Sequence, residues 1–155
     1  MADIVSRYIE CYVYKKFDDG IKYLLLKRSP EKQPYPGIWQ IVTGKIEEEE
    51  KAYNTALREV TEETGLKPVK YYVAPKINEF YTPHNDNIYL IPVFVINVKD
   101  EDVILSEEHT HFEWLDFKSA YERIHWYSQK ENLKIIDDLL TGKVENTMIE
   151  ISLSF

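Results

Sequence analysis

The sequence has a single cysteine, Cys11, and no apolar run long enough to cross a membrane. One cysteine cannot form an internal disulfide or build a cysteine-based zinc cluster, so Cys11 is interpreted as a small apolar strand residue. The most apolar stretch, residues 88–98, is shorter than the roughly 20 apolar residues of a membrane helix. The first ten residues lack the basic segment, apolar stretch and cleavage site of a signal peptide. We therefore expect a cytoplasmic protein without membrane partners.

Positive charge is also scarce, because 19 Lys and Arg residues stand against 27 Asp and Glu residues, a formal net charge of −8. Such a chain should repel a phosphodiester backbone, which disfavours nucleic-acid partners. A small phosphorylated substrate stays open, since carboxylates that hold divalent cations can reverse the local sign of charge. With 155 residues, of which 44% are hydrophobic, the chain is expected to form one domain.

Along the chain, apolar residues alternate with polar ones in some segments, as in strands, and recur at helical spacing in others. The order of elements predicts a mixed sheet flanked by helices, with a domain over residues 1–142 and a tail over 143–155. The tail alternates apolar and polar residues, so it could add an edge strand or form the contact of a homodimer. Strands are predicted at 6–17 and 21–27 (joined as a hairpin by Asp18, Asp19 and Gly20), 38–43, 69–81, 88–99 and 111–115, and helices at 50–64 (ending at Gly65), 117–124 and 129–140.

Glutamates occupy one side of the first predicted helix. Glu59, Glu62 and Glu63 are spaced i, i+3 and i+4, whereas Tyr53, Ala56, Leu57 and Val60 form an apolar stripe on another side, expected to pack on the sheet. Three adjacent carboxylates repel one another unless a cation offsets their charge. Hard oxygen ligands of this kind suit Mg²⁺ or Mn²⁺, and nothing in the sequence distinguishes the two. Arg58 precedes Glu62 by four residues and is expected to orient the glutamates.

The wider pattern is a glycine, five residues, a glutamate, seven residues, and then a continuous block. It reads Gly44, Glu50 and the segment Arg58-Glu59-Val60-Thr61-Glu62-Glu63-Thr64-Gly65-Leu66, and it resembles the Nudix box of the Nudix hydrolases at every fixed position. The resemblance implies an α/β/α sandwich with a mixed sheet, in which a loop-helix-loop motif binds the metals that support hydrolysis of a diphosphate linkage.

Residue roles follow from this resemblance by position. Glu59, Glu62 and Glu63 would bind metal and take part in catalysis, with Arg58 beside them. Glu50 would be a supporting or outer ligand, and Gly44 the loop turn within the metal site. The general base would lie either on the helix or on a later loop, where Glu107 and Glu108 are the candidates; we favour Glu108 as a metal-site and catalytic residue.

Segments outside the box resemble bacterial dihydroneopterin triphosphate pyrophosphatases, also described as dATP pyrophosphohydrolases. These segments are residues 39–44, 108–116 and 132–136. By that resemblance Trp39 and Gln40 would lie near the substrate, and Arg28, at the end of a strand, could meet phosphates. Packing is the alternative role for Trp39, and solvated surface charge the alternative for Arg28. The expected reaction releases pyrophosphate and a monophosphate from a nucleoside or pterin triphosphate.

Other functions remain open at this point. Tyr81 and Pro83 lie where family members that act on dinucleoside polyphosphates or ADP-ribose often carry a marker residue, so Tyr81 is a further substrate-binding candidate. A binding module without activity would usually have lost some of the glutamates. His109 and His111 would share one side of a regular strand, but zinc is disfavoured because further histidine or cysteine partners are lacking.

Overall fold

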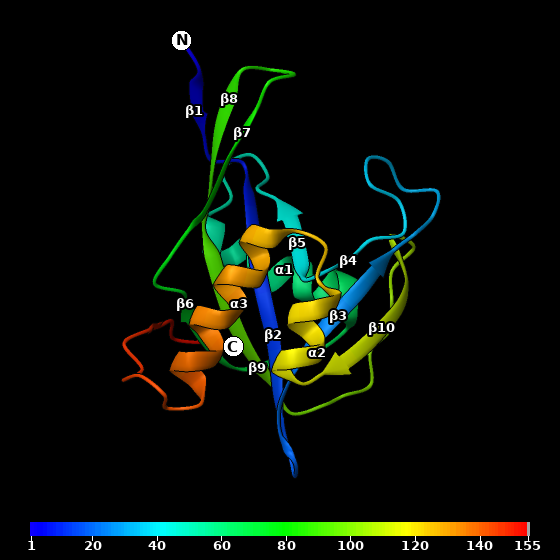
Figure 1. Ribbon diagram of the computed structural model, residues 1–155, viewed down its shortest axis with the longest axis vertical. Helices are drawn as coiled ribbons and strands as arrows, with labels where there is room; N and C mark the ends of the chain where they lie inside the picture. Colours follow the sequence, from blue (N-terminus) through cyan, green and yellow to red (C-terminus); the bar gives the residue numbers. More distant parts are fainter. Residues whose placement is uncertain (155) are drawn as a thin grey trace.

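The computed structural model describes residues 1–154, which form a sandwich of helices around a mixed sheet (Figure 1). The strands of the main sheet follow the order β10-β3-β2-β9-β6-β11, with β4 paired to β3 and β5 to β2. Helix α1 lies behind this sheet in Figure 1, and α2 and α3 lie in front. The elements of this sandwich are β2 (Tyr8–Phe17), β3 (Gly20–Arg28), β4 (Trp39–Gln40), β5 (Val42–Lys45), α1 (Ala52–Thr64), β6 (Pro68–Val73), β9 (Val93–Val98), β10 (His109–Leu115), α2 (Phe117–Arg123), α3 (Tyr127–Leu140) and β11 (Ile149–Glu150).

The central strand β2 is buried on both faces because helices cover both sides of the sheet. Ile9, Cys11 and Val13 pack in the core under α1, whereas Tyr12 and Tyr14 pack in the core under α2 and α3. Such a strand needs apolar residues at nearly every position, as central strands between two helical layers do. The predicted hairpin of β2 and β3, the three helices and the α/β/α arrangement are all present.

The sheet divides next to its centre, and this division positions the site. The C-terminal end of β2 pairs with β3 over residues 14–17 only. The N-terminal end of β2 pairs with β5 over residues 8–11. The other end of β3 pairs with β4 and β10. The predicted strand 38–43 is therefore wrong as a single element, because β4 and β5 belong to different neighbours and Ile41 between them packs in the core.

A second, three-stranded sheet projects from the sandwich at the top of Figure 1. It contains β1 (Asp3–Val5), β8 (Asn87–Ile91) and β7 (Asn78–Thr82), in that order. The long strands predicted at 69–81 and 88–99 are each divided between the two sheets. Pro92, which lacks an N–H for the ladder, separates β8 from β9. Strand β1 was not predicted, since its parallel pairing with β8 is a non-local contact.

The buried face of α1 differs from the predicted stripe. Ala56 and Val60 are buried as expected, but Tyr53 is 39% exposed and Glu63 is buried. The helix ends at Gly65, whose φ of 70° is the left-handed conformation that glycine adopts readily. Over residues 1–154, the helices are all too short or too polar to cross a membrane. In the tail, β11 pairs with β6, and a dimer contact there stays a prediction; Phe155 lies outside the described residues.

Candidate active site

The acidic face of α1 borders an open cavity of about 330 Å³. Glu59, Glu62 and Glu63 form one wall, and the loop before β10 forms the other with Ser106, Glu107 and Glu108. Helix and loop are more than 40 residues apart in the sequence, so only the fold brings these carboxylates together. Five glutamates around one cavity produce a strongly negative potential that favours cations.

Gly44 allows α1 to lie close to the sheet. It pairs with Ile9 of β2, and a Cβ atom built on Gly44 would overlap the side chain of Glu59. Any larger residue at this position would displace Glu59. The glycine of the Nudix pattern therefore acts here through space rather than through an unusual φ, because its φ is not in the left-handed region.

Arg58 holds the glutamates on one side of the cluster. Its Nε and Nη2 donate to the two carboxylate oxygens of Glu50 at 2.8 and 2.9 Å, and its Nη1 donates to Glu59 at 2.9 Å and Glu62 at 3.2 Å. Glu50 also accepts from the hydroxyl of Thr55 at 2.7 Å. Hydrogen bonds from Arg58 and Thr55 lower the pKa of Glu50 to about 2. The predicted contact of Arg58 with Glu62 is thus present within a larger network.

Glu63 has no such cation beside it. Its side chain is 3% exposed, and burial, together with the charges of Glu59 and Glu108, raises its pKa to about 9. Burial also raises the pKa of Glu59 despite the contact with Arg58. The Oε2 atom of Glu63 has no hydrogen-bond partner among the described residues. A buried carboxylate oxygen without a donor, facing other carboxylates, fits a divalent cation as its missing partner.

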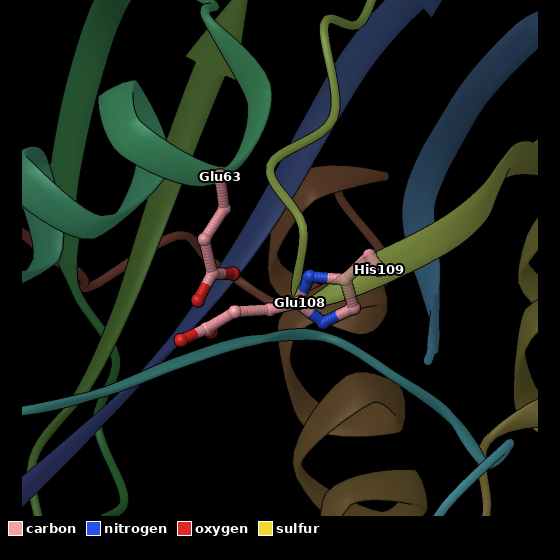
Figure 2. Close-up of side chains that lie close together, drawn as sticks. All are labelled: Glu63, Glu108 and His109. Atoms are coloured by element: carbon pink, nitrogen blue, oxygen red, sulfur yellow. The ribbon is translucent and has the colours of Figure 1, made fainter. Parts of the chain in front are cut away.

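Glu108 and His109 complete this part of the site (Figure 2). One ligand atom from each of Glu63, Glu108 and His109 lies within 4.8 Å of the others. Glu63 reaches the group from the end of α1, Glu108 from the loop before β10, and His109 from the first position of β10. Glu108 also accepts from Lys32 Nζ at 3.0 Å. These three residues could hold one metal ion, and Glu59 and Glu62 line the same cavity.

Of the predicted substrate residues, Arg28, Trp39 and Gln40 lie around the division of the main sheet and Tyr81 lies apart from it. Trp39 is partly buried against the core with the Arg123 guanidinium 5.0 Å from its ring, and Gln40 is 5% exposed, 3.3 Å from His109. Arg28 donates to the carbonyl oxygen of Pro34 in the loop between β3 and β4. Tyr81 lies on the projecting sheet, where its hydroxyl donates to Asp86.

His109 is the residue whose position the sequence did not reveal. A bulge in the pairing of β10 with β3 lies between His109 and His111, so the two histidines do not follow regular alternation. His109 is 5% exposed inside the protein, whereas His111 is exposed. Burial lowers the pKa of His109 to about 4, which keeps its ring neutral near pH 7. Its adjacency to Glu108 was the available signal, but a bulge cannot be located from one sequence.

Comparison with known proteins identifies the family of this chain. The model of the NUDIX domain matches residues 10–139. A dihydroneopterin triphosphate diphosphatase of Haemophilus influenzae is 28% identical over 135 residues, covering 79% of this chain and 81% of that protein. An octanoyltransferase of Myxococcus xanthus is 33% identical over 134 residues, covering 83% of this chain but only 36% of that protein, so most of the octanoyltransferase lies outside the match.

Among solved structures, a binary complex of the Caenorhabditis elegans Ap4A hydrolase superposes with a TM-score of 0.71 at 20% identity, covering 89% of this chain and 98% of that one. This likeness shows a common fold. The family model covers most of the chain, so this chain belongs to the NUDIX domain family. It is a Nudix hydrolase, and such enzymes generally need a divalent metal.

Proposed function

We propose that this hydrolase converts a nucleoside or pterin triphosphate to the monophosphate and pyrophosphate, with Mg²⁺ or Mn²⁺ as its metal. The observation that carries the proposal is the complete carboxylate set around one cavity, where Glu63 is buried without a cationic partner. The similarity to a dihydroneopterin triphosphate diphosphatase supports the substrate class. A divalent cation, when bound, would offset phosphate charge and lower the pKa of a bound water.

The residues of the chain have distinct parts in this proposal. Glu59, Glu62, Glu63 and Glu108 would hold the cation, and Arg58 would fix Glu59 and Glu62 while neutralising part of their charge. Glu108, exposed at the cavity wall, is our candidate for accepting a proton from the attacking water. The exposed position of a base allows it to exchange that proton with solvent after each turnover.

Substrate would enter from the side where the sheet divides. Arg28 and Trp39 lie on β3 and β4 at this division, next to the strand that carries His109. We assign Arg28 to the phosphates and Trp39 to the planar ring of the substrate. Gln40 is buried against His109, which suits support of the site better than direct contact with substrate.

A dinucleoside polyphosphate or ADP-ribose is the second candidate substrate. The observation in its favour is the projecting sheet, where Tyr81 is exposed and Phe80 stacks on Tyr89 with ring centroids 5.3 Å apart. Exposed aromatic rings of this kind can stack on a second base. A regulator without activity is disfavoured by the intact glutamates.

The experiment is a substrate screen with Mg²⁺, in which products are resolved by chromatography. The panel holds dihydroneopterin triphosphate, the standard and oxidised dNTPs, diadenosine polyphosphates and ADP-ribose. We expect pyrophosphate and a monophosphate from one or more triphosphates. Selective cleavage of the dinucleotides or ADP-ribose would establish the second candidate, and no turnover despite metal binding would establish the regulator.

Two variants link the activity to the site. Glu62→Gln removes a carboxylate from the cavity while keeping size and helix propensity, and it should reduce turnover. Glu122→Gln is the matched control, because Glu122 is an exposed residue of α2 outside the cavity. Equal turnover by Glu62→Gln and wild type would refute the assigned site.

A further inference from the structure

His109 has one ring nitrogen that the protein leaves without a partner. Its Nε2 lies 3.3 Å from the Nε2 atom of Gln40, whereas its Nδ1 has no hydrogen-bond partner among residues 1–154. The ring is 5% exposed, and in a neutral imidazole one nitrogen is a donor and the other an acceptor. Buried polar atoms without a partner are rare, and each calls for a ligand or water that completes it.

The Glu63 carboxylate near His109 also has an atom without a hydrogen-bond partner in the part of the chain that the structure describes. Figure 2 shows a nitrogen of the His109 ring on the side nearest the Glu63 carboxylate, whose Oε2 is also without a partner. The ligand atoms of Glu63, Glu108 and His109 lie within 4.8 Å of one another, yet no hydrogen bond joins His109 to either glutamate in the described structure. A cation between them would satisfy the lone pair of the nitrogen and the carboxylates together.

The distribution of positive charge points to the same three residues. Arg58 contacts Glu50, Glu59 and Glu62, and neither its hydrogen bonds nor its ion pairs include Glu63. Lys32 pairs with Glu108 from the solvent side, at 3.0 Å. The Glu63 end of the cluster is therefore the part that protein cations leave uncompensated.

We propose that His109 is a nitrogen ligand, through Nδ1, of a divalent transition-metal ion held with Glu63 and Glu108, so that this site prefers Mn²⁺ to Mg²⁺. Mg²⁺ takes an all-oxygen octahedral shell, whereas imidazole is a ligand for first-row transition metals. The histidine thus gives the cluster a selectivity that glutamates alone do not provide. This inference concerns the metal and does not depend on which phosphate compound is the substrate.

The proposal assigns Gln40 a positioning role. With Nδ1 on the metal, the proton of the neutral ring lies on Nε2 and needs an acceptor. Rotating the Gln40 amide by half a turn exchanges its nitrogen and oxygen within the same volume, and the oxygen then accepts from Nε2. Metal-binding histidines commonly donate their second ring N–H to an oxygen in this way.

The direct test is pulsed electron paramagnetic resonance of Mn²⁺ bound to the 155-residue chain without substrate. A directly bound imidazole couples its ¹⁴N nucleus to the Mn²⁺ electrons, and oxygen ligands do not. We expect ¹⁴N modulation in the wild-type protein, which changes to the ¹⁵N pattern when histidine alone is labelled with ¹⁵N. Bound Mn²⁺ without histidine modulation, or no Mn²⁺ binding, would overturn the proposal without any variant that might misfold.

Variants then identify the histidine. His109→Gln should abolish the modulation and weaken Mn²⁺ binding about 10-fold or more, while Mg²⁺ affinity changes much less. His111→Gln is the matched control, since His111 is exposed on the same strand and lies outside the cluster. Loss of modulation in His111→Gln rather than in His109→Gln would refute the assignment.

The outcome is separable from that of the proposed function. Pyrophosphate release with Mg²⁺ and no ¹⁴N coupling with Mn²⁺ would leave the hydrolase proposal intact and refute His109 as a ligand. Histidine coupling without turnover of any tested substrate would support His109 as a ligand and contradict the hydrolase proposal. Gln40→Leu, which removes the acceptor for Nε2, should weaken Mn²⁺ binding but leave the ¹⁴N modulation present.

Discussion

Glu10 and Glu63 are two buried glutamates in different surroundings. Glu10 of β2 is 2% exposed and Glu63 of α1 is 3% exposed, and burial is the largest cause of a raised pKa at both. Glu10 accepts from the Gln129 side chain of α3 and has the Asn78 amide beside it. Glu63 instead faces Glu59 and Glu108, whose charges raise its pKa further.

Burial alone does not mark a functional carboxylate in this protein. Each glutamate even leaves one oxygen without a partner among the described residues. Amides around Glu10 can stabilise either protonation state, so this residue can serve the fold without a ligand. Carboxylates around Glu63 only add repulsion, which a cation would reverse. The chemical nature of the neighbours therefore separates the two roles.

Metal removal should give the largest difference between the site around Glu63 and the core around Glu10. We expect EDTA to reduce hydrolysis to background, because the repelling carboxylates then have no cation and the substrate phosphates have no counter-charge. The fold, including Glu10 and its amides, should persist, since both cores are built from protein side chains. Turnover and circular dichroism should be measured before and after chelation, and again with excess Mg²⁺. Unfolding on chelation would contradict the assignment of a metal-binding role to Glu63 and a structural role to Glu10.

Gly44→Ala should have an intermediate effect. The added methyl group would overlap Glu59, so the Glu59 side chain must leave its present position. We expect turnover to fall roughly 10- to 100-fold, because a catalytic group that is misplaced by about 1 Å loses activity on this scale. Steady-state kinetics with Mg²⁺ checks the expectation. Turnover equal to that of the wild type would mean that the position of Glu59 is not critical.

Glu10→Gln should change the pH dependence of stability and leave turnover nearly unchanged. Burial raises the pKa of Glu10 above its ordinary value of 4.5, so the folded state holds the proton more tightly than the unfolded state does. Stability from this group is therefore complete below pH 4.5 and is lost as the pH rises towards the folded-state pKa.

The measurement for Glu10→Gln is urea unfolding of both proteins with EDTA, from about pH 5 to about pH 8. The wild type should lose stability relative to the variant as the pH rises, because glutamine cannot release a proton. A difference in unfolding free energy that is independent of pH would show that Glu10 titrates alike in both states.

Local sequence signals predicted the elements that carry most of the chemistry. The hairpin followed from a turn of three residues between two apolar runs, and α1 followed from its spacing and from Gly65. The carboxylate face of α1 followed from the spacing of its glutamates, whereas the α/β/α sandwich and the residue roles came from the resemblance carried by the Nudix box, whose family is confirmed. Signals of this kind lie within a few residues of one another and need no knowledge of tertiary contacts.

Features set by distant contacts could not be predicted. The projecting sheet depends on pairing Asp3–Val5 with Asn87–Ile91, and the burial of Glu63 depends on how α1 lies on the sheet. The bulge that turns His109 inward depends on its register with β3. One sequence contains no record of these registers, and the substrate residues remain a prediction for the same reason.

The most direct test of the account compares pyrophosphate release by the wild-type protein, Glu63→Gln and Glu10→Gln in one assay, with Mg²⁺ and the best triphosphate of the screen. The same chemical change is then made in each buried carboxylate. We predict that Glu63→Gln lowers the rate by about 100-fold or more, since a group that holds the metal is lost, while Glu10→Gln stays within about threefold of the wild type. Equal rates for Glu63→Gln and the wild type, or a larger loss in Glu10→Gln, would contradict the assignment of the site.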